Sequence, residues 1–193
     1  MAAAQERLVH AHCEGVDYTF VRANRLTSFC FGGPLEGGVT GVEHGPRRLH
    51  TIGRLSGRAI PALSRHYFSA FPLIYGMCFD GCEMTYRLMP NGSVEVLHMS
   101  TTRSSDDWPY RDFPTLLPFV PLALATATPR SYVDFAKRFP NLPDRPEGQL
   151  VVCVPPPATV GVSLWASGDY EGVTIVFDCD LTTATVHAYN VTT

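Results

Sequence analysis

Two cysteines four positions apart, Cys78 and Cys82, come nearest to a chemical site in this chain. On an extended strand, residues i and i+4 share a face but lie about 13 Å apart at roughly 3.3 Å per residue. A disulfide needs α-carbons within about 7 Å, so only a turn at residues 80–81 would join the two sulfurs. Structural zinc needs four ligands, usually from two paired C-x-x-C elements, and no second pair accompanies this C-x-x-x-C. We therefore predict structural thiols, no bound metal and no cofactor, with Cys153 and Cys179 as small core residues.

Histidines offer two further kinds of chemistry. His10 and His12 would share one face of a strand, as metal-binding pairs do, but two ligands make a weak site and an exposed N-terminal strand is the simpler interpretation. A cysteine-dependent hydrolase that pairs Cys78 or Cys82 with a histidine such as His98 is the alternative function. The chain lacks the local signatures that identify a nucleophile in known hydrolase and cysteine-protease families.

Paired carboxylates occur at Asp106 and Asp107 and again at Asp178 and Asp180. Adjacent residues on a loop usually point apart, and an aspartate at a strand end usually accepts hydrogen bonds from turn backbone. The carboxylates therefore indicate turns rather than acid–base catalysis, and we expect no catalytic residue among them.

The segment from Ser104 to Pro121 is the strongest candidate for a binding surface. It combines several prolines, which exclude a regular helix, with acidic and aromatic residues. Aromatic residues and arginine are favoured anchors at protein interfaces, and long loops in compact domains are often functional. The predicted binding residues are Asp106, Asp107, Trp108, Tyr110, Arg111, Asp112 and Phe113.

Composition excludes several classes of function. The formal net charge is -3 and no basic run is present, so we do not expect nucleic-acid binding. The N-terminus does not resemble a secretory signal. The most apolar run, Leu116 to Ala127, is shorter than the roughly 20 residues that span a bilayer, and prolines interrupt it. The sequence thus predicts a soluble cytoplasmic protein without a membrane segment.

Strand patterns dominate the elements that must position these residues. The clearest is a hairpin in which residues 83–89 and 93–99 alternate on either side of Pro90-Asn91-Gly92, a sequence suited to a turn. Near the N-terminus, Asp17–Arg22 and Thr27–Gly33 also read as strands. Close to the C-terminus, short connections indicate an antiparallel meander. Its four expected strands are Gln149–Val154, Thr159–Trp165, Gly172–Cys179 and Thr185–Asn190.

Three helices are expected. Leu49, Ile52 and Leu55 recur at three-residue steps and predict a first helix, and a second begins at Pro61. The third covers residues 128–139, with Thr128 as its N-cap and Pro129 in its first turn. Its apolar stripe consists of Tyr132, Phe135, Ala136 and Phe139.

These elements predict an α+β fold, a mostly antiparallel β-sheet with a few helices packed on one face. We expect one domain over residues 1–193, and a division into parts 1–71 and 72–193 is the alternative. A helix-flanked antiparallel sheet, mild acidity and the lack of catalytic motifs together resemble small bacterial immunity or scaffold proteins in general character, although no motif carries the likeness. The sequence therefore predicts a non-enzymatic binding protein that engages a protein partner, with toxin neutralisation as one form of that function. An acidic loop would suit a basic partner.

Overall fold

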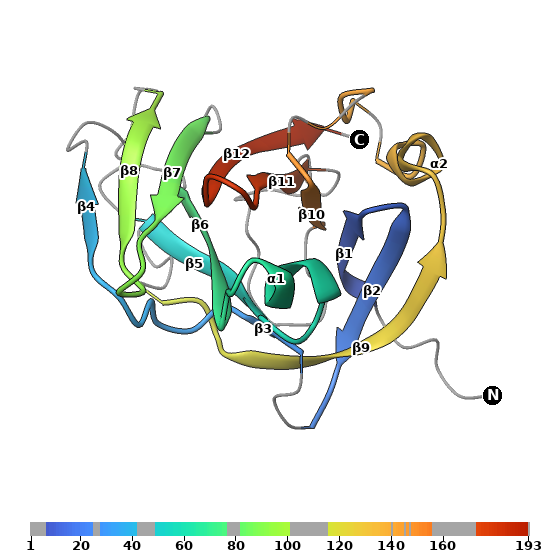
Figure 1. Cartoon of the computed structure of the whole chain (residues 1–193), viewed down its shortest axis with the longest axis horizontal. Coiled ribbons are helices and arrows are strands. Elements are labelled where there is room, and N and C mark those ends of the chain that lie inside the picture. The colour runs from blue at the N-terminus through green and yellow to red at the C-terminus, as the bar shows by residue number, and fades with distance from the viewer. Residues whose placement is uncertain are drawn as a thin grey trace.

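The computed structural model describes residues 7–24, 28–41, 49–76, 82–100, 116–139, 141–144, 146, 148–155 and 173–192. In this part of the chain, twelve strands form one sheet and two helices of five residues accompany it (Figure 1). Neither helix is long enough or apolar enough to cross a lipid bilayer. The elements are β1 (Arg7–Cys13), β2 (Val16–Arg22), β3 (Phe29–Phe31), β4 (Val39–Gly41), β5 (Leu49–Ser56), α1 (Pro61–Arg65), β6 (Ala70–Gly76), β7 (Met84–Leu88), β8 (Val94–Met99), β9 (Val120–Pro129), α2 (Tyr132–Ala136), β10 (Leu150–Val154), β11 (Val173–Asp180) and β12 (Thr185–Thr192).

The strands follow the order β4-β8-β7-β12-β11-β10-β1-β2-β9-β3-β5-β6. Every neighbouring pair is antiparallel except β4 and β8, which confirms the expectation of a mostly antiparallel sheet. The sheet curls so strongly that β6, the last strand in this order, contacts β7 and β12. In Figure 1 the strands accordingly surround α1.

Two tyrosine hydroxyls join β6 to the strands that it meets. Tyr86 on β7 accepts a hydrogen bond from the backbone N–H of Ile74 (3.2 Å) and donates one to the carbonyl of Pro72 (3.1 Å). The Tyr75 hydroxyl lies 2.9 Å from Oδ1 of Asn190 on β12. The Tyr86 hydroxyl thus bonds to two backbone groups of β6, the last strand in the order.

Apolar side chains form two clusters on opposite faces of the sheet. Alternation along β10 places Leu150 and Val152 in the large inner cluster and Val151 in the smaller outer one. Helix α1 contributes buried residues to the inner cluster, whereas Phe135 of α2 belongs to the outer cluster. The expectation that the helices pack on one face is therefore not confirmed.

Several predicted elements are confirmed. The hairpin is β7 and β8, and its inward residues Met84, Tyr86 and Leu88 are all buried. The antiparallel meander is β10, β11 and β12, although residues 159–165 lie outside the described part of the chain. The helix expected from Pro61 exists, but it ends at Arg65.

The helix expected over Leu49, Ile52 and Leu55 is wrong, because these residues belong to strand β5. A bulge explains the misleading spacing. Thr51 pairs with Ile74 and Gly53 pairs with Leu73, so Ile52 is an extra residue that shifts the phase of the two-residue alternation. The bulge interrupts the two-residue alternation of the strand, and apolar residues therefore recur at three-residue steps.

The expected start of the third helix is also wrong. Pro129 still pairs with Val16 in the sheet, and the N–H of Arg130 donates to the carbonyl of Gly15 (2.9 Å). The chain therefore stays extended until Ser131, whose side chain caps α2 by accepting from the N–H of Asp134. The apolar stripe itself is confirmed, with Phe135 and Phe139 buried.

Candidate functional site

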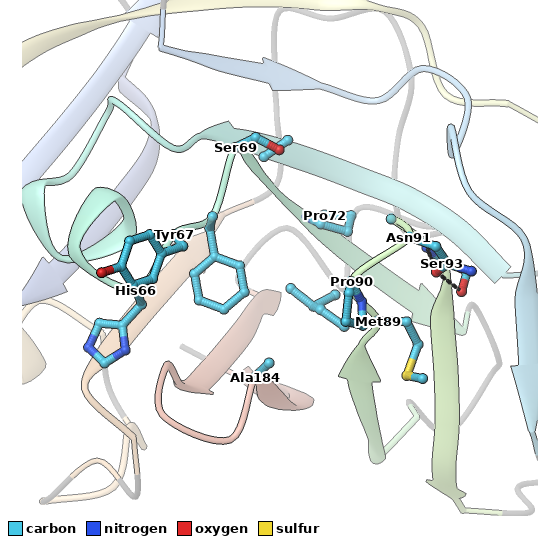
Figure 2. A pocket seen from close by; sticks show the side chains of 13 residues that line it. His66, Tyr67, Ser69, Pro72, Met89, Pro90, Asn91, Ser93 and Ala184 are labelled. Carbon is cyan, nitrogen blue, oxygen red and sulfur yellow. Dashed lines mark hydrogen bonds between the residues drawn. The ribbon is translucent and has the colours of Figure 1, made fainter.

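A groove of about 500 Å³ lies where three chain connections meet. Figure 2 shows His66 and Tyr67 on one side of this groove, from the connection between α1 and β6. Met89 and Pro90, from the turn between β7 and β8, stand on the other side, and Ala184 from the β11–β12 turn lies below. Segments distant in sequence therefore build one surface feature, which we call the Tyr67 groove.

The end of α1 fixes the backbone of Tyr67. The N–H of Tyr67 donates to the carbonyl of Ser64 (3.1 Å), and the N–H of Phe68 donates to the carbonyl of Leu63 (3.0 Å). This pair of bonds is the Schellman motif, which requires a left-handed residue at the position of Tyr67 and usually has glycine there. Tyr67 accordingly has a φ of 63°. For a residue with a β-carbon, that conformation costs about 1–2 kcal/mol.

The side chain of Tyr67 does not offset this cost through packing, because the residue is 95% exposed. Its neighbour behaves differently. Phe68 packs against the inner core and meets Phe71 edge to face, with ring centroids 5.0 Å apart. The fold thus holds the backbone at residue 67 rigidly and presents an aromatic ring to solvent beside the groove.

The turn between β7 and β8 forms a well-ordered opposite wall. The carbonyl of Met89 accepts from the N–H of Gly92 (2.9 Å), and the N–H of Met89 donates to the carbonyl of Ser93 (2.9 Å). Gly92 has a φ of 80°, as this type of three-residue hairpin loop requires. Oδ1 of Asn91 accepts from both the N–H (3.0 Å) and the hydroxyl (2.6 Å) of Ser93. These bonds fix the backbone of the turn that forms this wall.

The lining of the Tyr67 groove contains few groups that can carry a charge. None of its thirteen described lining residues carries a carboxylate, an ammonium or a guanidinium group. The lining offers aromatic and aliphatic surface, hydroxyl groups, one amide and the imidazole of His66. Such a lining suits apolar contact with a few hydrogen bonds, and it supplies no nucleophile–base pair among the described residues.

A second, polar pocket of about 550 Å³ lies on the outer face of β7, β11 and β12. His187 Nε2 lies 3.1 Å from Oε1 of Glu83, and Oδ1 of Asp178 accepts from the N–H of Gly148 (2.8 Å). Asp180 accepts from Thr183, and this hydroxyl is the main reason that the pKa of Asp180 falls below its ordinary value. These carboxylates bind neighbouring groups of the protein, and in the described part of the chain no three His, Cys, Asp or Glu side chains are placed to hold a metal ion.

The binding residues predicted from the sequence lie outside the described residues. This holds for all seven residues: Asp106, Asp107, Trp108, Tyr110, Arg111, Asp112 and Phe113. Their role therefore stays a prediction. What the structure does describe, the Tyr67 groove, was not among the sequence-based candidates.

The structure describes only some of the residues that the cysteine-based alternative requires. Cys82 is buried in the inner core, whereas His98 is exposed and pairs with Thr85, whose neighbours Met84 and Tyr86 point inward. A buried thiol facing the core does not suit a nucleophile. Cys78 lies outside the described residues, so a hydrolase that uses it stays a prediction. Cys153 and Cys179 are buried as expected, and burial raises the pKa of both thiols.

The expectation of an exposed strand at His10 and His12 is wrong in one respect. The strand exists, but β1 lies in the middle of the sheet and His12 is buried beneath α2. His12 Nδ1 lies 2.8 Å from Oδ1 of Asp17, and its ring packs against Tyr132 and Phe135. This histidine therefore helps to join α2 to the sheet.

One signal for the Tyr67 groove was present in the sequence. The segment "PALSRHYFSAF" begins with a helix-starting proline and contains no glycine to end the helix. In the structure α1 ends at Arg65, and Tyr67 takes the left-handed position after the cap residue His66, where glycine is usual. The second wall depends on long-range pairing of the hairpin, which local sequence does not reveal.

No protein-family model matches this sequence, and comparisons with curated proteins and with solved structures find no significant relative. Evidence for the function therefore comes from the geometry of the described residues.

Proposed function

We propose that this chain is a non-enzymatic, cytoplasmic binding protein that engages a protein partner, and that the Tyr67 groove is part of its contact surface. The observation that carries the proposal is Tyr67 itself. It occupies a strained backbone position, contributes almost no packing, and stands beside a preorganised groove. Residues kept in unfavourable conformations concentrate at functional sites, and exposed tyrosines are favoured interface anchors.

A lining without carboxylate, ammonium or guanidinium groups indicates the chemistry of the partner segment. Burying a charged side chain without an opposite charge is costly. The described lining offers no carboxylate, ammonium or guanidinium group that could pair with such a side chain. The occupant is therefore an uncharged, apolar segment of the partner, whose backbone can bond to the hydroxyl groups of the groove. Aromatic-lined grooves commonly accept extended, proline-containing segments in this way.

The acidic and aromatic segment around Trp108, which the sequence predicts as a binding surface, remains part of the proposal as a second contact. It supplies the charge that the groove lacks, and it would attract a basic partner over a distance. Toxin neutralisation is one form of the proposed function, and it is proposed from the sequence alone.

A photo-crosslinking experiment tests the proposal. A photoreactive phenylalanine derivative replaces Tyr67 in the full chain, and the control variant carries it at Val133, an exposed apolar residue of α2. We expect a specific protein adduct from position 67 and none from position 133. The captured protein is then purified, and its affinity is measured for the unmodified chain and for Tyr67→Ala.

Alanine keeps a β-carbon in the left-handed position, so this variant removes the ring and leaves the backbone cost in place. We expect the affinity to fall by about 2 kcal/mol, as is typical for an aromatic anchor, while Val133→Ala leaves it unchanged. Equal affinity for Tyr67→Ala and the unmodified chain would contradict the proposal.

A further inference from the structure

Strand β9 has a neighbouring strand on only one side over its second half. Its first three residues, 120–122, pair with β3. The following residues, as far as Pro129, pair with β2, and in the described part of the chain no strand pairs with their other side. Figure 1 shows this half of β9 at the periphery of the sheet, where it runs toward α2. We call the uncovered side of residues 124–128 the β9 edge.

The register at the end of β9 shows which backbone groups point to this edge. The N–H of Arg130 donates to the carbonyl of Gly15, which precedes β2, so Arg130 faces β2. Alternate residues of an antiparallel strand direct their backbone groups to opposite sides. Thr128 and Thr126 therefore face β2 as well. Ala127 lies between them and directs its N–H and its carbonyl to the β9 edge.

The register at the start of β9 identifies a second residue of this kind. The carbonyl of Pro121 accepts from the N–H of Ala23, which follows β2, so Pro121 faces β2 and Leu124 faces away from it. A bulge at Ala125 then separates Leu124 from Ala127. The outward backbone groups of the β9 edge are therefore three residues apart, whereas those of a regular strand are two residues apart.

The side chains of this half of β9 leave the edge open and uncharged. Residues 124–129 are all exposed, so neither face of the strand is covered there, whereas residues 17–21 of the neighbouring β2 are buried. No charged side chain occurs from residue 116 to residue 129. Folded proteins commonly protect an edge strand with charged residues, and like charges that face each other across two strands are destabilising. Two copies of this edge can therefore approach without charge repulsion.

We propose that the β9 edge pairs antiparallel with the β9 edge of a second copy of this chain, about a two-fold axis. Leu124 of one copy then lies opposite Ala127 of the other, and the two residues exchange both N–H···O bonds. The axis generates the same pair a second time. The bulge is the reason that a second copy fits, because an identical edge has the same three-residue spacing between its outward groups and a regular strand does not.

The ends of the β9 edge limit the contact to two copies. Strand β3 covers the residues before the edge, and Pro129 has no N–H to donate after it. A two-fold contact also uses the same edge of both copies, so the pairing closes as a dimer and does not extend into a fibre. The β9 edge shares no residue with the Tyr67 groove, and this proposal does not depend on the function proposed for that groove.

Amide hydrogen exchange tests the pairing on the full, isotope-labelled chain. Nuclear magnetic resonance follows the exchange of each amide at micromolar and at millimolar concentration, and sedimentation of the same samples reports the fraction of dimer. We expect a dimer at millimolar concentration, with exchange at Leu124 and Ala127 slowed about tenfold or more relative to the dilute chain. The amide of Thr128 is the internal control, because it faces β2 and its exchange should not depend on concentration.

Two variants at one position separate backbone pairing from side-chain contact. Ala127→Pro removes the outward N–H and spares the bonds to β2, whereas Ala127→Ser keeps that N–H. We expect Ala127→Pro to weaken the dimer about tenfold or more, because each of the two pairs loses one bond, and Ala127→Ser to leave it unchanged. Circular dichroism verifies that each variant is folded, and the exchange rates of the unmodified chain decide the question if Ala127→Pro is not.

Three results overturn the proposal. The first is a chain that stays monomeric at millimolar concentration, which would leave the β9 edge to a strand of another protein. The second is a dimer that forms without slower exchange at Leu124 and Ala127. The third is a folded Ala127→Pro variant that dimerises as well as Ala127→Ser.

Discussion

Asp17→Asn is expected to destabilise the fold strongly, because this carboxylate joins three elements. It accepts from Arg130, Arg138 and His12, and it is almost completely buried. Removing one partner of a buried ion pair typically costs about 3–5 kcal/mol. Here both arginines reach solvent and recover part of their hydration, and the asparagine carbonyl still accepts one bond. We therefore expect the free energy of unfolding to fall by about 3 kcal/mol.

Urea unfolding followed by circular dichroism measures this loss, with the slope of the transition compared between variants. Glu95→Gln is the matched control, since it also converts a carboxylate to an amide beside an arginine, but on an exposed surface. Such exposed pairs contribute about 0–1 kcal/mol, so the control should remain close to the unmodified chain. A loss below about 1 kcal/mol for Asp17→Asn would refute the view that this carboxylate holds α2 on the sheet.

Two further predictions follow from burial. Phe135→Ala should lower the free energy of unfolding by about 3–5 kcal/mol, because Phe135 is fully buried in the outer cluster; an unchanged melting temperature would show that α2 does not pack there. In the native chain at pH 8, a thiol reagent should rapidly modify at most one of the six cysteines. The five described thiols are buried, and burial raises the pKa of Cys13 to about 12. Rapid modification of Cys82 would instead support the hydrolase alternative.

Sequence patterns predicted the parts of the fold that depend on interactions between residues close together in the sequence. Pro90, Asn91 and Gly92 specify their turn by backbone preference, and alternation along β7 and β11 specifies which residues point inward. The same reasoning failed in β5, where one bulged residue shifted the phase of the alternation and imitated helical spacing.

Long-range pairing decided the rest. Thr128 and Pro129 have the local features of a helix start, but pairing with β2 keeps them extended. The closure of the sheet depends on hydroxyl groups of Tyr75 and Tyr86 that meet strands distant in sequence. The Tyr67 groove likewise requires three connections to meet, so sequence patterns alone do not define it.

Tyr67→Gly, compared with Tyr67→Ala, tests most directly whether this residue is kept for binding rather than for folding. Glycine adopts a positive φ without a steric cost, so it should raise the free energy of unfolding by about 1 kcal/mol relative to both tyrosine and alanine. The same variant should bind the crosslinked partner about 30-fold more weakly, which corresponds to about 2 kcal/mol. Higher stability together with weaker binding is the result that we predict. Lower stability in Tyr67→Gly, or undiminished affinity for the partner, would contradict it.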